Sequence, residues 1–172
     1  MTGLSGAGKS TLAQRLKAQL AADRCLAIVL DGDILRSGLN ADLGFSSEER
    51  LENIRRTAEV AALFRDSGFV VVCALISPEA AHRQLARSIV RERYFEVHID
   101  SSVAVCESRD PKGLYARARR GELREFTGIS APYEPPSSPD IAIDTAHSSV
   151  DDAAERLHAF VRNRIRPLTV EA

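Results

Sequence analysis

Short runs of consecutive apolar residues alternate with longer amphipathic segments along this chain. The apolar runs fall at 26–30, 69–76, 94–99 and 140–144. Unbroken apolar runs are typical of strands that are covered on both faces. Segments with helical patterning lie at roughly 9–22, 47–67, 78–91 and 149–165. This order predicts an α/β fold in which right-handed crossovers build a parallel sheet with helices on both faces.

The segment 47–67 shows the helical pattern most clearly. Its apolar residues are spaced to share one face: Leu51, Ile54, Ala58, Ala61 and Ala62. Ser46 or Ser47 is suited to cap the first turn, and Gly68 is suited to end the helix. We therefore expect one long helix that packs on the sheet through this apolar face.

Composition indicates one ordinary globular domain, because 44% of the 172 residues are hydrophobic and 27% are charged. We expect this domain to cover residues 1–166, followed by a short tail at 167–172. The net charge of −1 gives no electrostatic reason to expect a nucleic acid or a membrane as partner. Three widely spaced cysteines fit neither a disulfide framework nor a metal site. A reducing, cytoplasmic setting is therefore expected.

Residues 3–10 read G-x-x-x-x-G-K-S, which is the phosphate-binding P-loop. Its glycines let the backbone N–H groups point at phosphate oxygens, and the helix that follows favours an anion at its N-terminus. Lys9 is suited to reach the β- and γ-phosphates, and Ser10 to offer a hydroxyl to Mg²⁺. The residues expected to hold ATP are Gly3, Leu4, Ser5, Gly6, Ala7, Gly8, Lys9, Ser10 and Thr11. This motif narrows the predicted fold class to an α/β fold with a P-loop NTPase-type parallel sheet.

A P-loop normally follows a buried strand, yet only Met1 and Thr2 precede Gly3. The first strand is therefore expected to be largely missing from this chain. Loss of a central strand is costly to a parallel sheet. We therefore expect the sequence to be an excerpt from a longer polypeptide.

Asp31 and Asp33 follow the first apolar run, where strand ends face the ligand crevice of such folds. One carboxylate is suited to hold a Mg²⁺-bound water, and the other to accept a proton from an attacking hydroxyl. Further along, Arg36 follows Asp33, and Arg50 and Asn53 share one helix face. An arginine and an amide on one face are suited to hold an anionic nucleotide group. The alternative is a salt-bridged polar face of the helix, which we expect for Arg56 and Arg65.

The segment 109–139 is a long, basic, proline-containing connection between two predicted strands. Long connections inside a domain are usually functional, and a kinase needs a lid that excludes water from ATP. Phe126 lies in this predicted lid, and Phe45 lies in a glycine-containing loop before the long helix. Each aromatic either stacks on a base or covers an edge of the core.

Taken together, these residues resemble the adenylylsulfate kinase family over nearly the whole chain, from Gly3 to about Ile165. The blocks that carry the resemblance are 30–33 (LDGD), 36–40 (RSGLN), 43–46 (LGFS), 50–56 (RLENIRR), 76–78 (ISP), 105–107 (VCE), 109–115 (RDPKGLY), 126–129 (FTGI) and 132–134 (PYE). The resemblance implies transfer of the ATP γ-phosphoryl group, with Mg²⁺, to the ribose 3′-hydroxyl of adenosine 5′-phosphosulfate (APS). The product is 3′-phosphoadenosine 5′-phosphosulfate (PAPS).

The same resemblance implies roles for individual residues. Phe45 and Phe126 would sandwich the APS adenine, while Arg36, Arg50 and Asn53 would hold its phosphosulfate and ribose. Asp33 would contact the 3′-hydroxyl, Lys112 would help to close the lid, and Arg109 would lie by the ATP adenine. Ser77 matches a serine described as a phosphorylated intermediate in the family, although direct in-line transfer suffices. Mg²⁺ would be held by Ser10 and Asp31.

Some positions depart from the family pattern. Glu79 and Ala80 stand where the family usually has an aromatic residue or histidine followed by arginine, and Ile34 and Ser37 replace an asparagine and a histidine. Other family members are fused to ATP sulfurylase or form homodimers, so we expect either arrangement here. Two alternatives stay open: another small-molecule kinase, and a catalytically inactive nucleotide-binding regulatory domain of a fused sulfurylase.

Overall fold

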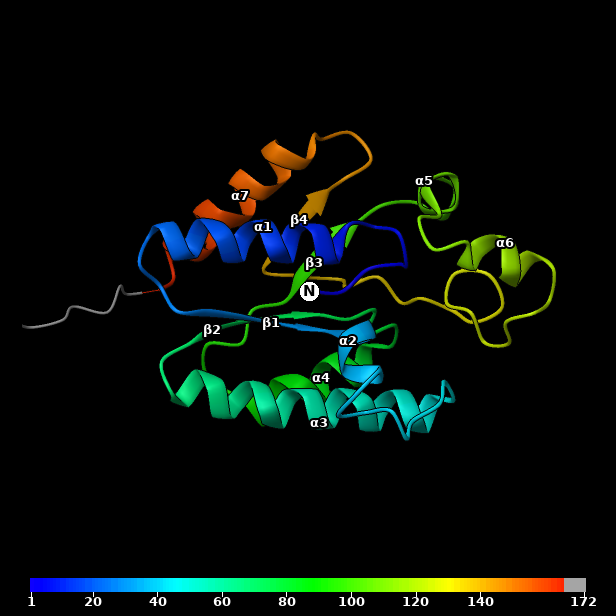
Figure 1. Ribbon diagram of the computed structural model, residues 1–172, viewed down its shortest axis with the longest axis horizontal. Helices are drawn as coiled ribbons and strands as arrows, with labels where there is room; N and C mark the ends of the chain where they lie inside the picture. Colours follow the sequence, from blue (N-terminus) through cyan, green and yellow to red (C-terminus); the bar gives the residue numbers. More distant parts are fainter. Residues whose placement is uncertain (166–172) are drawn as a thin grey trace, which may run out of the picture.

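The computed structural model describes residues 1–165, so the expected tail at 167–172 and the last residue of the expected domain lie outside the described residues. Strands and helices alternate along most of the described chain (Figure 1). In chain order they are α1 (Lys9–Ala22), β1 (Ala27–Asp31), α2 (Gly32–Arg36), α3 (Ser47–Asp66), β2 (Val70–Ala74), α4 (Ala80–Val90), β3 (Val97–Asp100), α5 (Val103–Arg109), α6 (Leu114–Arg119), β4 (Ile141–Asp144) and α7 (Val150–Arg162).

Two parallel strand pairs form the sheet, β1 with β2 and β3 with β4. The first residues of the chain join these pairs, and the N-terminus lies between them in Figure 1. On one side the Met1 nitrogen donates to the Cys73 carbonyl at 2.8 Å. On the other side the Thr2 N–H donates to the Val97 carbonyl, and the Ile99 N–H donates to the Thr2 carbonyl, both at 2.8 Å. The expected first strand is therefore reduced to a short stub at the centre of the sheet.

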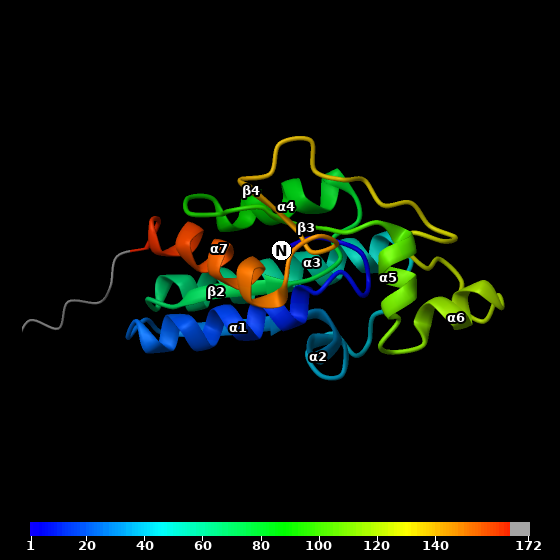
Figure 2. The ribbon, with the colours of Figure 1, turned by 90° about the horizontal axis from the view of Figure 1, so that it is seen from above.

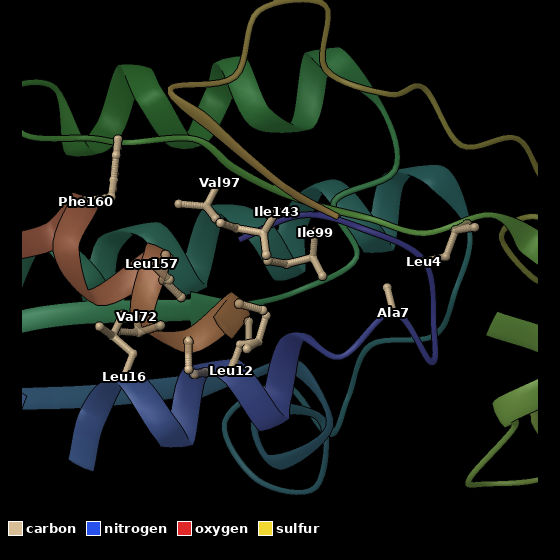
Figure 3. Close-up of a cluster of buried hydrophobic side chains, with 14 of the residues drawn as sticks. Leu4, Ala7, Leu12, Leu16, Val72, Val97, Ile99, Ile143, Leu157 and Phe160 are labelled. Carbon is tan, nitrogen blue, oxygen red and sulfur yellow. The ribbon is translucent and has the colours of Figure 1, made fainter. Parts of the chain in front are cut away.

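Helices cover both faces of the sheet, as predicted. α1 and α7 pack on one face, and α3 and α4 pack on the other (Figures 1 and 2). Leu12 of α1 and Leu157 of α7 meet Ile99 and Ile143 of the strands in the buried core (Figure 3). Unbroken apolar runs predict this arrangement, because a strand buried on both faces needs no polar side. No helix within residues 1–165 combines the length and apolarity needed to cross a membrane.

α3 follows its sequence prediction closely. The Ser46 side chain accepts from the Glu49 N–H, and the Glu49 carboxylate accepts from the Ser46 N–H, which completes a capping box. Gly68 follows the helix with φ of 88°, a conformation that favours glycine. Ile54 and other small apolar residues of this face are buried, but Leu51 is 38% exposed and lies outside it.

Element boundaries differ from the sequence predictions at several places. β3 begins at Val97 rather than at 94. α4 begins at Ala80 rather than at 78, because Glu79 before it has an extended backbone. α7 ends at Arg162 rather than at 165. α2 and α5 were not predicted, because helices of five and seven residues are too short to show a helical period. α6 lies within the predicted lid at 109–139.

Candidate active site

The P-loop leads from the N-terminal stub into α1. Gly3 has φ of 148°, and a Cβ there would lie 2.5 Å from the Ile99 carbonyl oxygen. Gly8 forms the N-cap of α1 with φ of 101°, in the left-handed region. Both positions therefore require glycine, one for a close backbone approach and one for its conformation. The loop wraps around the N-terminus of a 14-residue helix, where backbone N–H groups and the helix dipole favour an anion.

Lys9 folds back over this loop. Its Nζ donates to the carbonyls of Gly3 and Leu4 at 2.8 and 2.7 Å. Burial lowers the pKa of Lys9 from 10.5 to about 8. The ammonium is therefore poised beside the phosphate-binding backbone in a dry environment, where its charge acts strongly on an anion.

Ser10 and Asp31 bring oxygens together from two elements. The Ser10 Oγ donates to Asp31 Oδ2 at 2.5 Å, and Asp31 Oδ1 accepts from the Asp33 N–H at 2.9 Å. A hydroxyl and a carboxylate are hard oxygen donors, which Mg²⁺ prefers. Residues 1–165 contain no group of three or more His, Cys, Asp and Glu side chains suited to a metal. This donor set fits an ion held by few protein oxygens together with nucleotide phosphates.

Asp33 lies in the first turn of α2, directly beyond the end of β1. Its carboxylate forms an ion pair with Lys112, in the loop between α5 and α6. Both side chains are more than half exposed, so they face the open side of the site. Two residues expected to be catalytic therefore meet, although 79 positions separate them in the sequence.

Arg50 of α3 joins two loops. Its Nε donates to the Phe45 carbonyl at 2.8 Å, and its Nη2 donates to the Glu125 carbonyl at 2.7 Å. Since Glu125 directly precedes Phe126, one guanidinium ties both predicted aromatic segments to the same helix. Sequence spacing placed Arg50 on a helix face but gave no sign of this link to the lid.

Phe45 and Phe126 have different surroundings. Phe45 is 57% exposed, and the guanidinium carbon of Arg36 lies 4.4 Å from its ring centroid. Phe126 is half-buried and packs edge-to-face on Tyr115, with 5.0 Å between centroids. The Tyr115 hydroxyl donates to the Ser5 carbonyl at 2.9 Å. Phe45 thus keeps most of its surface exposed, while Phe126 is part of the packing that connects the lid to the P-loop.

Positive charge gathers beside Phe45. The guanidinium carbon of Arg50 lies 5.5 Å from the Phe45 ring, on which Arg36 also packs. Burial lowers the pKa of Arg36, and the neighbouring Arg50 guanidinium lowers it further. Two partly buried cations of like charge favour an anion between or beside them. The Arg36 Nη1 also donates to the Gly44 carbonyl at 2.6 Å, which holds the Phe45 loop in place.

Asn53 lies deeper than expected. Only 5% of its surface is exposed, and its Oδ1 accepts from Nδ2 of the fully buried Asn40 at 2.9 Å. Asn40 was not singled out by the sequence analysis, although it closes the motif at 36–40. Its role is to orient the Asn53 amide, so that the Nδ2 of Asn53 is the donor left for another partner.

Arg109 lies against the other side of the P-loop. Its Nη2 donates to the Thr145 carbonyl at 2.5 Å, and the Thr145 hydroxyl donates to the Ala7 carbonyl at 2.9 Å. Thr145 follows β4 and is buried, and no sequence signal marked it. The pair ties the end of the sheet to the nucleotide-binding loop.

Ser77 and Glu79 follow the end of β2. Ser77 has φ of 44°, a strained conformation for a residue with a side chain, and its carbonyl accepts from Arg83 Nη1 at 3.0 Å. Glu79 Oε1 accepts from the Ser47 hydroxyl at 3.0 Å, at the start of α3. Glu79, which departs from the family pattern, therefore connects the segment after β2 to α3, the helix that carries Arg50.

Comparison with known proteins agrees with this arrangement. A family model described as adenylylsulphate kinase matches residues 1–144. The chain is 58% identical over 161 residues to an adenylyl-sulfate kinase of Paraburkholderia xenovorans, covering 94% of this chain and 90% of that relative.

Solved structures show the same likeness. The structure of the Mycobacterium tuberculosis APS kinase CysC in complex with AMPPNP and APS superposes with a TM-score of 0.91 at 47% identity, covering 94% of each chain. A hexameric APS kinase from Thiobacillus denitrificans superposes with a TM-score of 0.69 at 31% identity, covering 94% of this chain and 28% of that one.

Proposed function

The chain belongs to the adenylylsulfate kinase family, and from that premise we propose how its residues divide the work of phosphoryl transfer. It is an ATP-dependent phosphotransferase that acts on APS. The reaction moves the γ-phosphoryl group of ATP to the ribose 3′-hydroxyl and gives PAPS and ADP. The roles of individual residues follow from their positions around the crevice.

ATP binds on the P-loop, with its phosphates on the backbone N–H groups of residues 3–11. Lys9 leaves the Gly3 and Leu4 carbonyls and places its charge against the β- and γ-phosphates. Ser10 and Asp31 would hold Mg²⁺, which supplies charge neutralisation on the phosphates when bound. Arg109 covers the nucleotide side of the loop through its contact with Thr145.

APS binds on the opposite side, between α3 and the lid. Its adenine stacks on the exposed face of Phe45 and is closed in by Phe126. Arg36 and Arg50 attract the phosphosulfate, and the Asn53 amide donates to the ribose or its substituents. The support for this assignment is the convergence of two guanidinium groups on one aromatic ring.

Asp33 orients the ribose 3′-hydroxyl and accepts its proton as the oxygen attacks the γ-phosphorus. The bond from that phosphorus to the bridging oxygen breaks, and ADP carries away the electron pair. Lys112 and Lys9 neutralise the charge on the moving group. Because donor and acceptor nucleotides bind side by side, transfer is direct, and Ser77 serves the wall of the site rather than a covalent intermediate.

The observation that carries this proposal is the meeting of Ser10, Asp31, Asp33 and Lys112 at one end of the sheet. The test is a turnover assay with this chain, Mg·ATP and APS, in which PAPS is detected by mass. Lys9→Ala is expected to lower turnover at least ~100-fold without loss of fold, by analogy with removing one transition-state stabiliser. Saturable binding of APS and ATP without PAPS would instead favour a regulatory domain.

Assembly and setting are also proposals. A homodimer is carried over from the family resemblance. Fusion to, or association with, ATP sulfurylase rests on the resemblance alone. The cytoplasmic setting is supported by the free thiols of Cys25, Cys73 and Cys106.

A further inference from the structure

The segment 76–78 follows β2 at the edge of the sheet that carries the proposed site. Ala74, the last residue of β2, lies beside Asp31 of β1 in the parallel ladder, so the segment begins next to the first carboxylate of the site. Ser77, at its middle, has φ of 44°, which a residue with a side chain seldom adopts. Strained backbone persists only where surrounding contacts hold it. The groups that hold this segment therefore bear on the site.

The carbonyl groups of the 76–78 segment are drawn into the protein. The Thr2 hydroxyl donates to the Ile76 carbonyl at 2.6 Å. Arg83 of α4 donates from Nη1 to the Ser77 carbonyl at 3.0 Å and to the Pro78 carbonyl at 3.3 Å. Because Thr2 and Arg83 are both buried, the three carbonyl oxygens face the interior.

Arg83 is itself fixed by an ion pair. Its Nε lies 2.7 Å from Oε1 of Glu96, a largely buried residue just before β3. The planar guanidinium thus serves a carboxylate through one nitrogen and two backbone carbonyls through another, a geometry that the single ammonium of lysine does not offer. Arg83 therefore fixes the 76–78 segment relative to the start of β3.

Glu134, in the last part of the predicted lid, holds the same segment from a second direction. Its N–H donates to the Pro78 carbonyl at 2.8 Å. Its Oε2 accepts from the N–H of Ala80, the first residue of α4, at 2.6 Å. The neighbouring Tyr133 hydroxyl lies 2.9 Å from the Thr2 hydroxyl. The lid is therefore tied to the segment through both its backbone and its side chains.

These contacts decide where the N–H groups of the segment point. In a trans peptide, the C=O of one residue and the N–H of the next point in opposite directions, and the described chain contains no cis peptide. Since the Ile76 and Pro78 carbonyls face the interior, the N–H groups of Ser77 and Glu79 face away from it. Within residues 1–165 neither N–H donates to another protein group.

We propose that Arg83 and Glu134 are positioning residues of the acceptor site. By drawing the carbonyls of the 76–78 segment inward, they present the N–H groups of Ser77 and Glu79 as donors to the anionic end of the acceptor nucleotide. The Glu79 carboxylate is drawn aside by its hydrogen bond with the Ser47 hydroxyl. This inference rests on the proposed function, in which APS is the acceptor.

The test compares the steady-state kinetics of Arg83→Lys and Glu134→Ala with those of the parent chain. Each variant is expected to raise the KM for APS by about 10-fold, while kcat and the KM for ATP stay within about twofold of the parent. Glu134→Gln keeps an oxygen that accepts from the Ala80 N–H and should restore the parent KM. Arg87→Lys is the matched control, because Arg87 lies one turn further along α4 and pairs among residues 1–165 with Glu96 and Asp140.

A second measurement follows the two N–H groups directly. With a non-hydrolysable ATP analogue bound, addition of APS is expected to shift the amide proton resonances of Ser77 and Glu79 downfield in the parent. The shifts should be smaller in Arg83→Lys at saturating APS. APS that binds without shifting either resonance would overturn the proposal.

The kinetic outcomes separate this proposal from the proposed function. If the parent forms PAPS and neither Arg83→Lys nor Glu134→Ala changes the KM for APS, the positioning role is overturned and the function stands. A parallel loss of kcat, both KM values and Tm would show a structural role only and would also overturn it. Glu134 is exposed, so Glu134→Ala keeps the test valid even if Arg83→Lys fails to fold. A folded parent that binds no APS would overturn the function, and this proposal with it.

Discussion

Lys112, in the loop between α5 and α6, forms an ion pair with Asp33 in the first turn of α2, although the two residues lie 79 positions apart. The pair spans the crevice in which the 3′-hydroxyl of APS is proposed to meet the γ-phosphate of ATP. In the proposed mechanism the lysine therefore acts on the carboxylate that receives the proton as well as on the phosphoryl group.

Asp33→Asn is expected to lower kcat by about 10²–10⁴-fold, because the amide cannot accept the proton of the hydroxyl. Lys112→Ala is expected to lower it by roughly 10-fold or more. In the double variant the two losses combine to less than their product, since the residues act as one unit. Steady-state kinetics of all four proteins measure this, and strictly multiplicative losses would contradict the pairing.

Nucleotide affinity is expected to depend on the proton of Lys9, whose pKa is lowered by burial to about 8. Below pH 8 the ammonium is charged both in the free protein and in the complex. Phosphates raise its pKa in the complex, so above pH 8 binding takes up a proton and affinity falls by up to ~10-fold per pH unit. Calorimetry in buffers of different ionisation enthalpy measures this uptake. Lys9→Arg keeps its charge at these pH values and serves as the control, because it takes up no proton.

Arg50→Lys keeps the positive charge but loses the geometry that lets one guanidinium donate to both the Phe45 and Glu125 carbonyls. The KM for APS is expected to rise by about 10-fold, because each 1.4 kcal/mol of lost interaction is a factor of ten. The KM for ATP stays near that of the parent. Arg55→Lys is the matched control: Arg55 lies on the same helix and pairs only with Glu52 and Glu59 among the described residues, so neither constant should move. If Arg50→Lys and Arg55→Lys changed the KM for APS equally, the proposed role of Arg50 in joining the two loops would be contradicted.

Asn40→Ala leaves the buried side-chain amide oxygen of Asn53, Oδ1, without its donor. The free energy of unfolding is expected to fall by about 1–3 kcal/mol, as for other unsatisfied buried polar groups. Urea titration measures this change. Asn163→Ala, at the C-cap of α7, removes a similar amide that has no such partner among residues 1–165, and should have a much smaller effect. Unchanged stability of Asn40→Ala would show that Asn53 finds another donor.

Local patterns predicted much of the fold. The P-loop glycines and the helical spacing after them define α1 from Lys9 to Ala22 as the structure has it. The serine before α3 and Gly68 after it define that helix to within one residue. These signals are local, because caps and turn glycines act on neighbouring backbone groups.

The links between distant segments could not be predicted from residue patterns. Arg50 donates to Glu125, 75 positions away, and Thr145 donates to Ala7, 138 positions away. Such contacts depend on how elements pack rather than on spacing within one element. Asn40 shows the same limit at shorter range, because only the folded loop before α3 brings it onto Asn53.

One side chain, Tyr115, touches both halves of the site: its hydroxyl binds the P-loop at Ser5, and its ring supports Phe126. A shift of the loop that is proposed to bind ATP is therefore expected to move the ring that is proposed to enclose APS. Linkage makes such coupling reciprocal, so each nucleotide changes the affinity of the other by the same factor. In the proposed mechanism, either nucleotide would therefore prepare the site for the other, and one phenol ring would carry that cooperation.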